Sequence, residues 1–168
     1  DLSECTEVFV EIGAETCSDA TLEAINRHHT WGDVEDAVSR LKSAGVHVGL
    51  HLIAGLPLET REDMLRSVRA ACDLGIDSLK MHQMQVIAGT ELHRRFLAGT
   101  SGVTPWQLDD YLDLCADIVD IVPRTIAIER FVAQAPTDML VAPLWGLKNH
   151  DFTDLLHALL RRRHPASL

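Results

Sequence analysis

Two kinds of apolar periodicity alternate along this chain, and their order limits the fold more than any other feature. Short apolar runs typical of buried strands stand at 7–12, 46–53, 78–87 and 125–132. After each run, apolar residues recur at helical spacing, in segments at 19–26, 30–45, 60–75, 92–97, 104–122 and 152–162. Strands that alternate with helices in this way predict a parallel sheet with right-handed crossovers, and therefore an α/β fold.

Polar residues ahead of the periodic segments mark where helices are predicted to begin. Thr30 stands three residues before Asp33, an arrangement like a capping box. Thr104 precedes a proline, which suits the first helical position. The predicted capping residues are Asp19, Thr30, Thr60, Thr104 and Asp151.

Length and charge narrow the class of protein. The 168 residues suit one domain with a substantial core, and 46% of them are hydrophobic. The formal net charge of −10 disfavours non-specific binding to nucleic acid. No apolar run is long enough to span a bilayer and no signal peptide is visible, so we expect a cytoplasmic protein and no membrane partner. The chain lacks an initiator methionine and soon enters an apolar strand, so we expect a piece of a longer protein.

Cysteine and histidine spacing gives a metal site little support. The four cysteines, Cys5, Cys17, Cys72 and Cys115, form no C-x-x-C pair, and reduced thiols are expected. His47 and His51 share a face of one predicted strand, and His82 lies on the next. Zinc could use such a set, although no H-E-x-x-H pattern accompanies it. A metal-dependent enzyme using these histidines remains an alternative.

Several residues able to bind a small ligand are predicted to gather where strands end. Gly55-Leu56-Pro57 follows one strand and precedes a capped helix; Glu15 and His51 lie near strand ends, and Arg27 near the end of a helix. Small ligands bind at the carboxyl edge of parallel sheets. A carboxylate, an imidazole and a guanidinium there could hold a ribose and an amino-acid head group. The alternatives are a plain tight turn for 55–57, a surface charge for Arg27 and a cap or salt-bridge partner for Glu15.

Five ordered segments resemble motifs of radical S-adenosylmethionine (SAM) enzymes. Glu11-Ile-Gly-Ala-Glu-Thr resembles their fourth-strand motif, and Ile25-Asn26-Arg27 the element that follows it. The segments 51–60, 80–90 and 135–145 resemble the fifth strand, the sixth strand and a C-terminal tail. Together they are similar to an uncharacterised bacterial subfamily often labelled Fe-S oxidoreductase. More distant similarity is to oxygen-independent coproporphyrinogen oxidases and elongator-type tRNA acetyltransferases.

This resemblance implies the C-terminal half of a partial TIM-type (β/α)6 barrel, strands four to six, over residues 1–100. Residues 101–168 would form a C-terminal α/β extension that packs on the barrel. The resemblance also implies that Glu15 contacts SAM, Arg27 pairs with its methionyl carboxylate and His51 meets its ribose. The segment from Ile53 through Gly55 and Leu56 to Pro57 would bind the adenine. Glu15 departs from the commoner glutamine of the family, and Leu58 from a glycine.

The resemblance implies a reductive cleavage of SAM at a [4Fe-4S] cluster, which yields a 5′-deoxyadenosyl radical. The C-x-x-x-C-x-x-C motif that holds this cluster is missing from the chain, so we expect the cluster in the full-length protein only and an inactive fragment. The substrate is unknown, and the candidates for binding it are Lys80, His82, Arg130 and Trp145, unless these merely pack or pair charges. We also expect self-association through an open sheet edge. A non-catalytic α/β module that binds a nucleotide or a protein is a further alternative.

Overall fold

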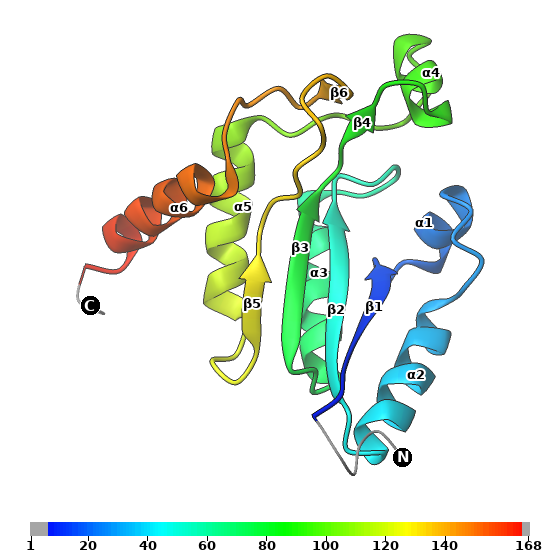
Figure 1. Ribbon diagram of the computed structural model, residues 1–168, viewed down its shortest axis with the longest axis vertical. Helices are drawn as coiled ribbons and strands as arrows, with labels where there is room; N and C mark the ends of the chain where they lie inside the picture. Colours follow the sequence, from blue (N-terminus) through cyan, green and yellow to red (C-terminus); the bar gives the residue numbers. More distant parts are fainter. Residues whose placement is uncertain (1–6, 166–168) are drawn as a thin grey trace.

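The computed structural model describes residues 7–165. Its strands are β1 (Phe9–Glu15), β2 (His47–Ala54), β3 (Ser78–Gln83), β4 (Val86–Ile87), β5 (Ala127–Arg130) and β6 (Leu140–Ala142). Its helices are α1 (Asp19–Ala24), α2 (Trp31–Ser43), α3 (Arg61–Asp73), α4 (Glu91–Leu97), α5 (Leu108–Ile121) and α6 (Asn149–Arg163). Figure 1 shows β1, β2, β3 and β5 side by side. All three strand pairs in this sheet are parallel, which confirms the predicted α/β class.

Helices cover one face of the sheet. Helix α2 packs on β1 and β2, α3 packs on β2, α5 packs on α3, and α6 packs on α5 (Figure 1). Successive side chains of a strand point to opposite faces. On β2, the side chains under the helices are Val48, Leu50, Leu52 and Ala54, and each is 0% exposed. The core therefore lies between the sheet and its helices.

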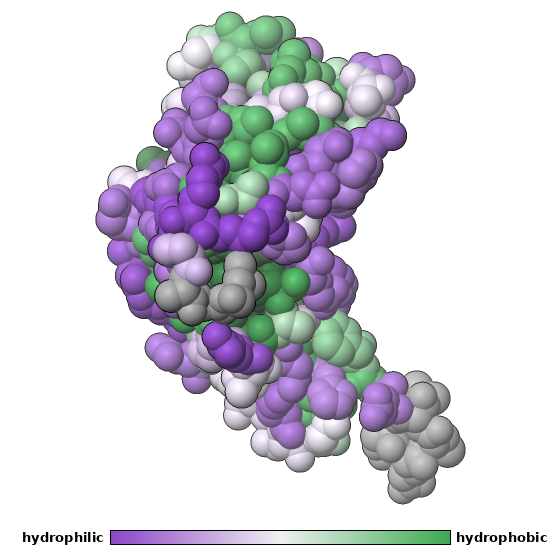
Figure 2. Space-filling model, turned by 90° about the vertical axis from the view of Figure 1, so that its left-hand side faces the viewer, coloured by the Kyte–Doolittle hydropathy of each residue, from purple (hydrophilic) through white to green (hydrophobic). Residues whose placement is uncertain are grey.

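The opposite face of the sheet is open, and Figure 2 shows the molecule hollowed on its right-hand side, where this face lies. We call it the concave face. It consists of Phe9, Glu11, Gly13 and Glu15 of β1, Gly49, His51 and Ile53 of β2, Ser78, Lys80 and His82 of β3, and Glu129 and Arg130 of β5. The two consecutive residues of β5 share this face because the register of β5 with β3 shifts there. An open parallel sheet with helices on its outer face has the arrangement of part of a (β/α) barrel wall.

Two of the predicted helix caps are confirmed and three are wrong. Thr30 and Thr60 cap α2 and α3, each with a complete capping box. The cap of α1 is Ser18, because the Asp19 carboxylate instead accepts a hydrogen bond from the Trp31 amide at 2.7 Å. Two other helices begin at residues different from those predicted. The cap of α5 is Gln107 rather than Thr104, and that of α6 is Lys148, whose amide donates to Asp151 at 2.9 Å.

The prediction of one strand over 78–87 is also wrong. β3 ends at Gln83, and β4 pairs antiparallel with β6, a strand that the sequence did not indicate. The Gln83 side chain explains the break, because it accepts from the Ala133 amide at 2.8 Å and donates to the Ala133 carbonyl at 3.0 Å. The chain leaves the parallel sheet at this point.

The division at residue 100 stays a prediction. β5, from the second predicted region, pairs with β3 in the same sheet, so the two regions share one core. The edges of the sheet are β1 and β5. Within residues 7–165, no helix is both long and apolar enough to cross a membrane.

Candidate functional site

Charged residues on the concave face form a continuous set of ion pairs across three strands. The Lys80 ammonium group contacts the Glu11 carboxylate and lies 3.0 Å from the Glu129 carboxylate. Ser78 donates a hydrogen bond to Glu129 at 2.5 Å, and this bond lowers the pKa of that carboxyl. Glu11 also lies 3.2 Å from the His51 ring. The predicted substrate candidate Lys80 is thus held between two carboxylates.

Glu15 and Arg27 meet at the carboxyl edge of the sheet, as predicted. Their charged groups lie 2.8 Å apart, and the same Arg27 nitrogen donates to the Gly13 carbonyl at 2.9 Å. Glu15 ends β1 with a φ of 65°, in the left-handed region, where the register of β1 with β2 also shifts. Burial raises the pKa of the Glu15 carboxyl, and the Arg27 charge opposes that rise. The pair can present both an acceptor and a donor to a zwitterionic ligand.

His51, His82 and Arg130 form the middle and the far side of the site. The His51 and His82 rings lie 5.5 Å apart between centroids, and the Arg130 guanidinium lies 2.8 Å from His82 Nε2. Burial lowers the pKa of His51, and burial together with the Arg130 charge lowers the pKa of His82 to about 4. Both imidazoles are therefore neutral at pH 7, and the structure brings three predicted site residues together.

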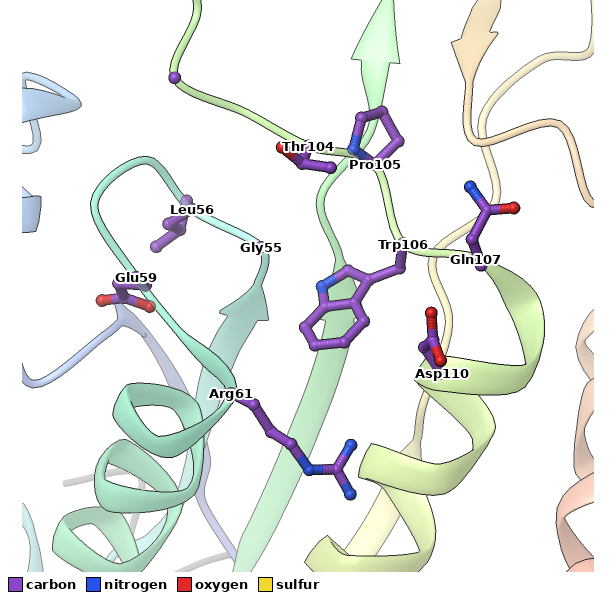
Figure 3. Close-up of a pocket in the computed structure, with 10 residues that line it drawn as sticks. Gly55, Leu56, Glu59, Arg61, Thr104, Pro105, Trp106, Gln107 and Asp110 are labelled. Carbon is purple, nitrogen blue, oxygen red and sulfur yellow. The ribbon is translucent and has the colours of Figure 1, made fainter.

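The predicted adenine segment is divided between two clefts. Gly55 and Leu56 line a cleft of about 340 Å³ between the starts of α3 and α5, where Figure 3 shows the Trp106 indole projecting toward the end of β2. A Cβ on Gly55 would lie 2.8 Å from Trp106 Nε1, so only glycine leaves room for the indole. Pro57 lines a second cleft of about 520 Å³, whose wall includes Met84. Ile53 lies on the concave face, half-buried.

Trp145 lies apart from the other substrate candidates. Its indole stacks on Phe152 with a centroid distance of 6.1 Å and contacts Tyr111 at 5.3 Å. Its Nε1 donates to the Trp106 carbonyl at 3.0 Å. These contacts belong to the packing between α5, α6 and the preceding loops, so Lys80, His82 and Arg130 gather on the concave face without Trp145.

The histidines and cysteines do not converge on one point. His47 lies at the opposite end of β2 from Ala54 and pairs with Asp77 at 3.4 Å, away from His51 and His82. Over residues 7–165, no group of three or more His, Cys, Asp or Glu side chains is arranged to hold a metal ion. Cys17 and Cys72 are half-buried and Cys115 is buried, while Cys5 lies outside the described residues. The donor set for a [4Fe-4S] cluster is thus not assembled by the described part of the chain.

Sequence reasoning missed four residues of this region: Glu11, Glu129, Trp106 and Glu59. The polar alternation Glu11-Gly13-Glu15 and Ser78-Lys80-His82 was a signal for an inward-facing charged set. Glu59 accepts a hydrogen bond from the Thr16 hydroxyl and links the loops after β1 and β2. Its other carboxylate oxygen is buried without a hydrogen-bond partner among the described residues, as is Trp106 Nε1, and burial raises the pKa of Glu59. Nothing in the local sequence indicated Trp106.

Comparison with known proteins identifies a family and several relatives of this chain. Residues 1–71 match the family model described as the Radical SAM superfamily, and residues 76–162 match the Radical_SAM C-terminal domain. The chain is 28% identical over 97% of its length to the uncharacterized protein YtqA of Bacillus subtilis, covering 50% of that protein. It is 30% identical over 83% of its length to protein YhcC of Escherichia coli K12, covering 44% of that protein.

A tRNA uridine(34) acetyltransferase of Methanocaldococcus jannaschii is 26% identical over 91% of the chain, which covers 28% of that protein. Among solved structures, the archaeal Methanocaldococcus infernus Elp3 with an N-terminal deletion superposes with a TM-score of 0.81. That match covers 93% of this chain and 36% of the other at 23% identity, and it shows a shared fold. The chain spans about half the length of the curated relatives YtqA and YhcC.

Proposed function

The chain belongs to the radical SAM superfamily, and from that membership we propose that it is part of an enzyme that binds SAM on the concave face. The observation that carries this proposal is the pairing of Glu15 with Arg27 at the carboxyl edge of β1, with His51 on the neighbouring strand β2. An open, polar edge of a parallel sheet is a ligand site in α/β proteins. The family's enzymes act on SAM, and the residues here fit its amino-acid and ribose groups.

The residues of the edge have distinct roles in this proposal. Arg27 would bind the methionyl carboxylate through its remaining N–H groups, because a guanidinium matches a carboxylate in shape and charge. Glu15 would accept from the methionyl ammonium group, and His51 would contact the ribose. Ile53 and the turn of Gly55, Leu56 and Pro57 would lie beside the adenine. SAM bound in this way is a source of radical chemistry when a [4Fe-4S] cluster supplies an electron.

The cysteines of this chain do not fit that cluster. Burial raises the pKa of the Cys115 thiol above the usual range and raises that of Cys72 as well, so both are held as thiols rather than as the thiolates that bind iron. The Cys17 sulfur accepts a hydrogen bond from the Ser67 hydroxyl at 3.3 Å. We propose that other parts of the complete protein bind the cluster and that this chain alone is inactive. We also propose that the complete protein is cytoplasmic.

The test compares the complete protein with this 168-residue chain after anaerobic reconstitution. Iron, sulfide and visible absorbance report the cluster, and chromatography reports 5′-deoxyadenosine. The proposal expects about four irons and SAM cleavage in the complete protein only. No cluster and no cleavage in the complete protein would reject it in favour of a non-catalytic binding module.

A second measurement on the chain alone tests the binding residues. S-adenosylhomocysteine should bind to the wild-type chain and bind at least about tenfold more weakly to Arg27→Gln, because one charge-assisted bond is lost. Glu15→Gln should retain binding, since an amide oxygen still accepts. Arg69→Gln, on the exposed surface of α3, is the matched control. Equal affinity of Arg27→Gln and the wild type would remove Arg27 from the site.

The tRNA substrate that the names of three relatives state does not suit the charge of this chain. The net charge of −10 opposes binding of a phosphate backbone, and the cations of the concave face are largely engaged by carboxylates.

We also propose that the isolated chain associates with itself through β1. This strand is an edge of the sheet, and Phe9 on it is 48% exposed. A monodisperse monomer at high concentration in sedimentation would reject self-association.

A further inference from the structure

Arg130 differs from the other cations of the concave face because no carboxylate lies against it. Arg27 pairs with Glu15, and Lys80 lies between two glutamates. Within residues 7–165, Arg130 takes part in no ion pair, and its guanidinium contacts the neutral His82 ring instead. Its Nε is buried and has no hydrogen-bond partner among the described residues. A buried charged donor without an acceptor is costly, so this side chain favours an acceptor that the described residues do not supply.

His82 fixes the direction of the Arg130 side chain without neutralising it. A guanidinium has only donors, so His82 Nε2 accepts at 2.8 Å and the ring proton resides on Nδ1. Burial and the neighbouring cations Arg130 and Lys80 favour this neutral form and hold the pKa of His82 near 4. The guanidinium is therefore held in place on one side, with the terminal N–H groups that His82 does not use available to a ligand.

The charges around Arg130 favour a ligand with one negative charge. Glu11 and Glu129 already lie on the same face, on either side of Lys80. A dianion such as phosphate would be repelled by these carboxylates, whereas a single carboxylate matches the planar guanidinium in charge and in bidentate geometry. We propose that Arg130, held by His82, binds a carboxylate group of the enzyme's substrate on the concave face.

The position of this carboxylate site relative to the SAM edge supports a role in substrate binding. His51 on β2 lies between the two, with its ring next to His82 and 3.2 Å from Glu11 of β1. Arg130 is opposite Lys80 in the pairing of β5 with β3, and two strands, β2 and β3, separate β5 from β1. The inference rests on the proposed function, because SAM would occupy the β1 side of the concave face. The substrate would then occupy the other side, near β3 and β5.

The experiment titrates the 168-residue chain with butyrate, a monocarboxylate, at constant ionic strength and follows the Arg130 Nε–H and His82 ring signals by NMR. We expect a saturable shift of both signals. Arg130→Gln should weaken butyrate binding at least about tenfold, and Arg130→Lys should weaken it by a smaller factor because lysine lacks the fork. Arg69→Gln removes the same charge from the outer surface and should leave butyrate affinity unchanged.

Competition with two other ligands distinguishes a substrate carboxylate from phosphate and from the carboxylate of SAM. Inorganic phosphate should bind more weakly than butyrate, and tighter phosphate binding would overturn the assignment to a carboxylate. S-adenosylhomocysteine should leave bound butyrate in place, whereas displacement would assign Arg130 to the SAM carboxylate. Absence of a saturable shift, or equal affinity in Arg130→Gln and Arg130→Lys, would also overturn the inference. None of these readouts needs the cluster, so a failure of SAM cleavage in the complete protein would reject the proposed function separately.

Discussion

The two faces of the parallel sheet are stabilised by different forces. On β2, Leu52 points into the helix layer and is 0% exposed, while the next residue, Ile53, is half-buried on the concave face. The helix-covered face is apolar and gains its stability from burial. The concave face consists largely of charges that pair with one another, and such pairs contribute little net stability when they are partly exposed. The helix-covered face therefore stabilises the fold, and the concave face is available for binding.

The sharpest test of this comparison substitutes neighbouring residues on opposite faces. Leu52→Ala should lower the free energy of unfolding by about 2–5 kcal/mol, because it leaves a cavity in a closely packed core. Ile53→Ala removes a similar side chain from the open face and should cost about 1 kcal/mol. Urea denaturation measures both values. Equal losses would mean that the concave face is as tightly packed as the core.

Removal of the central cation of the concave face should have the next largest effect. Lys80→Met leaves Glu11 and Glu129 facing each other and should cost about 1–3 kcal/mol at pH 7, between the values for exposed and buried pairs. The Ser78 hydrogen bond and the Lys80 charge lower the pKa of Glu129 in the folded state, so these contacts stabilise the protein above the unfolded pKa and their contribution is lost as the pH falls through the folded value. The double variant Lys80→Met/Glu129→Gln should recover part of the loss. No recovery would assign the effect to lost packing of the lysine stem.

Protonation of His82 should link the concave face to pH. The folded state lowers its pKa from 6.5 to about 4, so the unfolded chain binds a proton that the folded chain does not between these values. Stability therefore falls as the pH drops from 6.5 to 4, and His82 should account for about 1–2 kcal/mol of that fall after allowance for solvent screening. His82→Gln keeps a neutral acceptor for Arg130 and should reduce the pH dependence. An identical pH profile for the two proteins would contradict a buried, neutral His82.

The smallest expected effect on stability concerns the exposed aromatic residue of the concave face. Phe9 is 48% exposed, so Phe9→Ser should change the free energy of unfolding by less than about 1 kcal/mol. The same substitution should reduce self-association through β1, measured by sedimentation velocity over a range of concentrations. Leu97→Ser is a matched control, since Leu97 is 72% exposed but lies on α4. Equal reduction by both substitutions would indicate non-specific apolar association.

The apolar periodicities were sufficient to predict the four parallel strands and most of the helices, because burial of one face imposes them on the sequence. The caps at Thr30 and Thr60 were predictable since capping boxes are local. The break after Gln83 was not, because it depends on hydrogen bonds to Ala133, fifty residues away. The cap at Thr104 failed for a similar reason: Trp106 is held in an extended segment by its contacts with Gly55 and Trp145.

The identities of many site residues could be predicted from the sequence, but their contact partners could be predicted only in part. Glu15 and Arg27 followed from their motif, and the structure brings them to 2.8 Å. The partners of Lys80 could not be inferred from local sequence, since Glu11 and Glu129 come from strands 69 and 49 residues away along the chain. Parallel pairing joins distant segments, and their register is a tertiary property. Trp145 shows the converse, because its aromatic surroundings come from helices whose packing no motif specifies.

Gly13 restricts how this part of the chain can vary during evolution. A Cβ at this position would lie on the Arg27 guanidinium and 2.7 Å from the Glu15 carboxylate. Any other residue would therefore displace the ion pair even though the strand itself could accommodate it. Substitutions at 13, 15 and 27 are thus coupled, because a larger residue at 13 would move the ends of the two charged side chains from their present contact. The glycine therefore constrains the geometry of a pair to which it contributes no side chain.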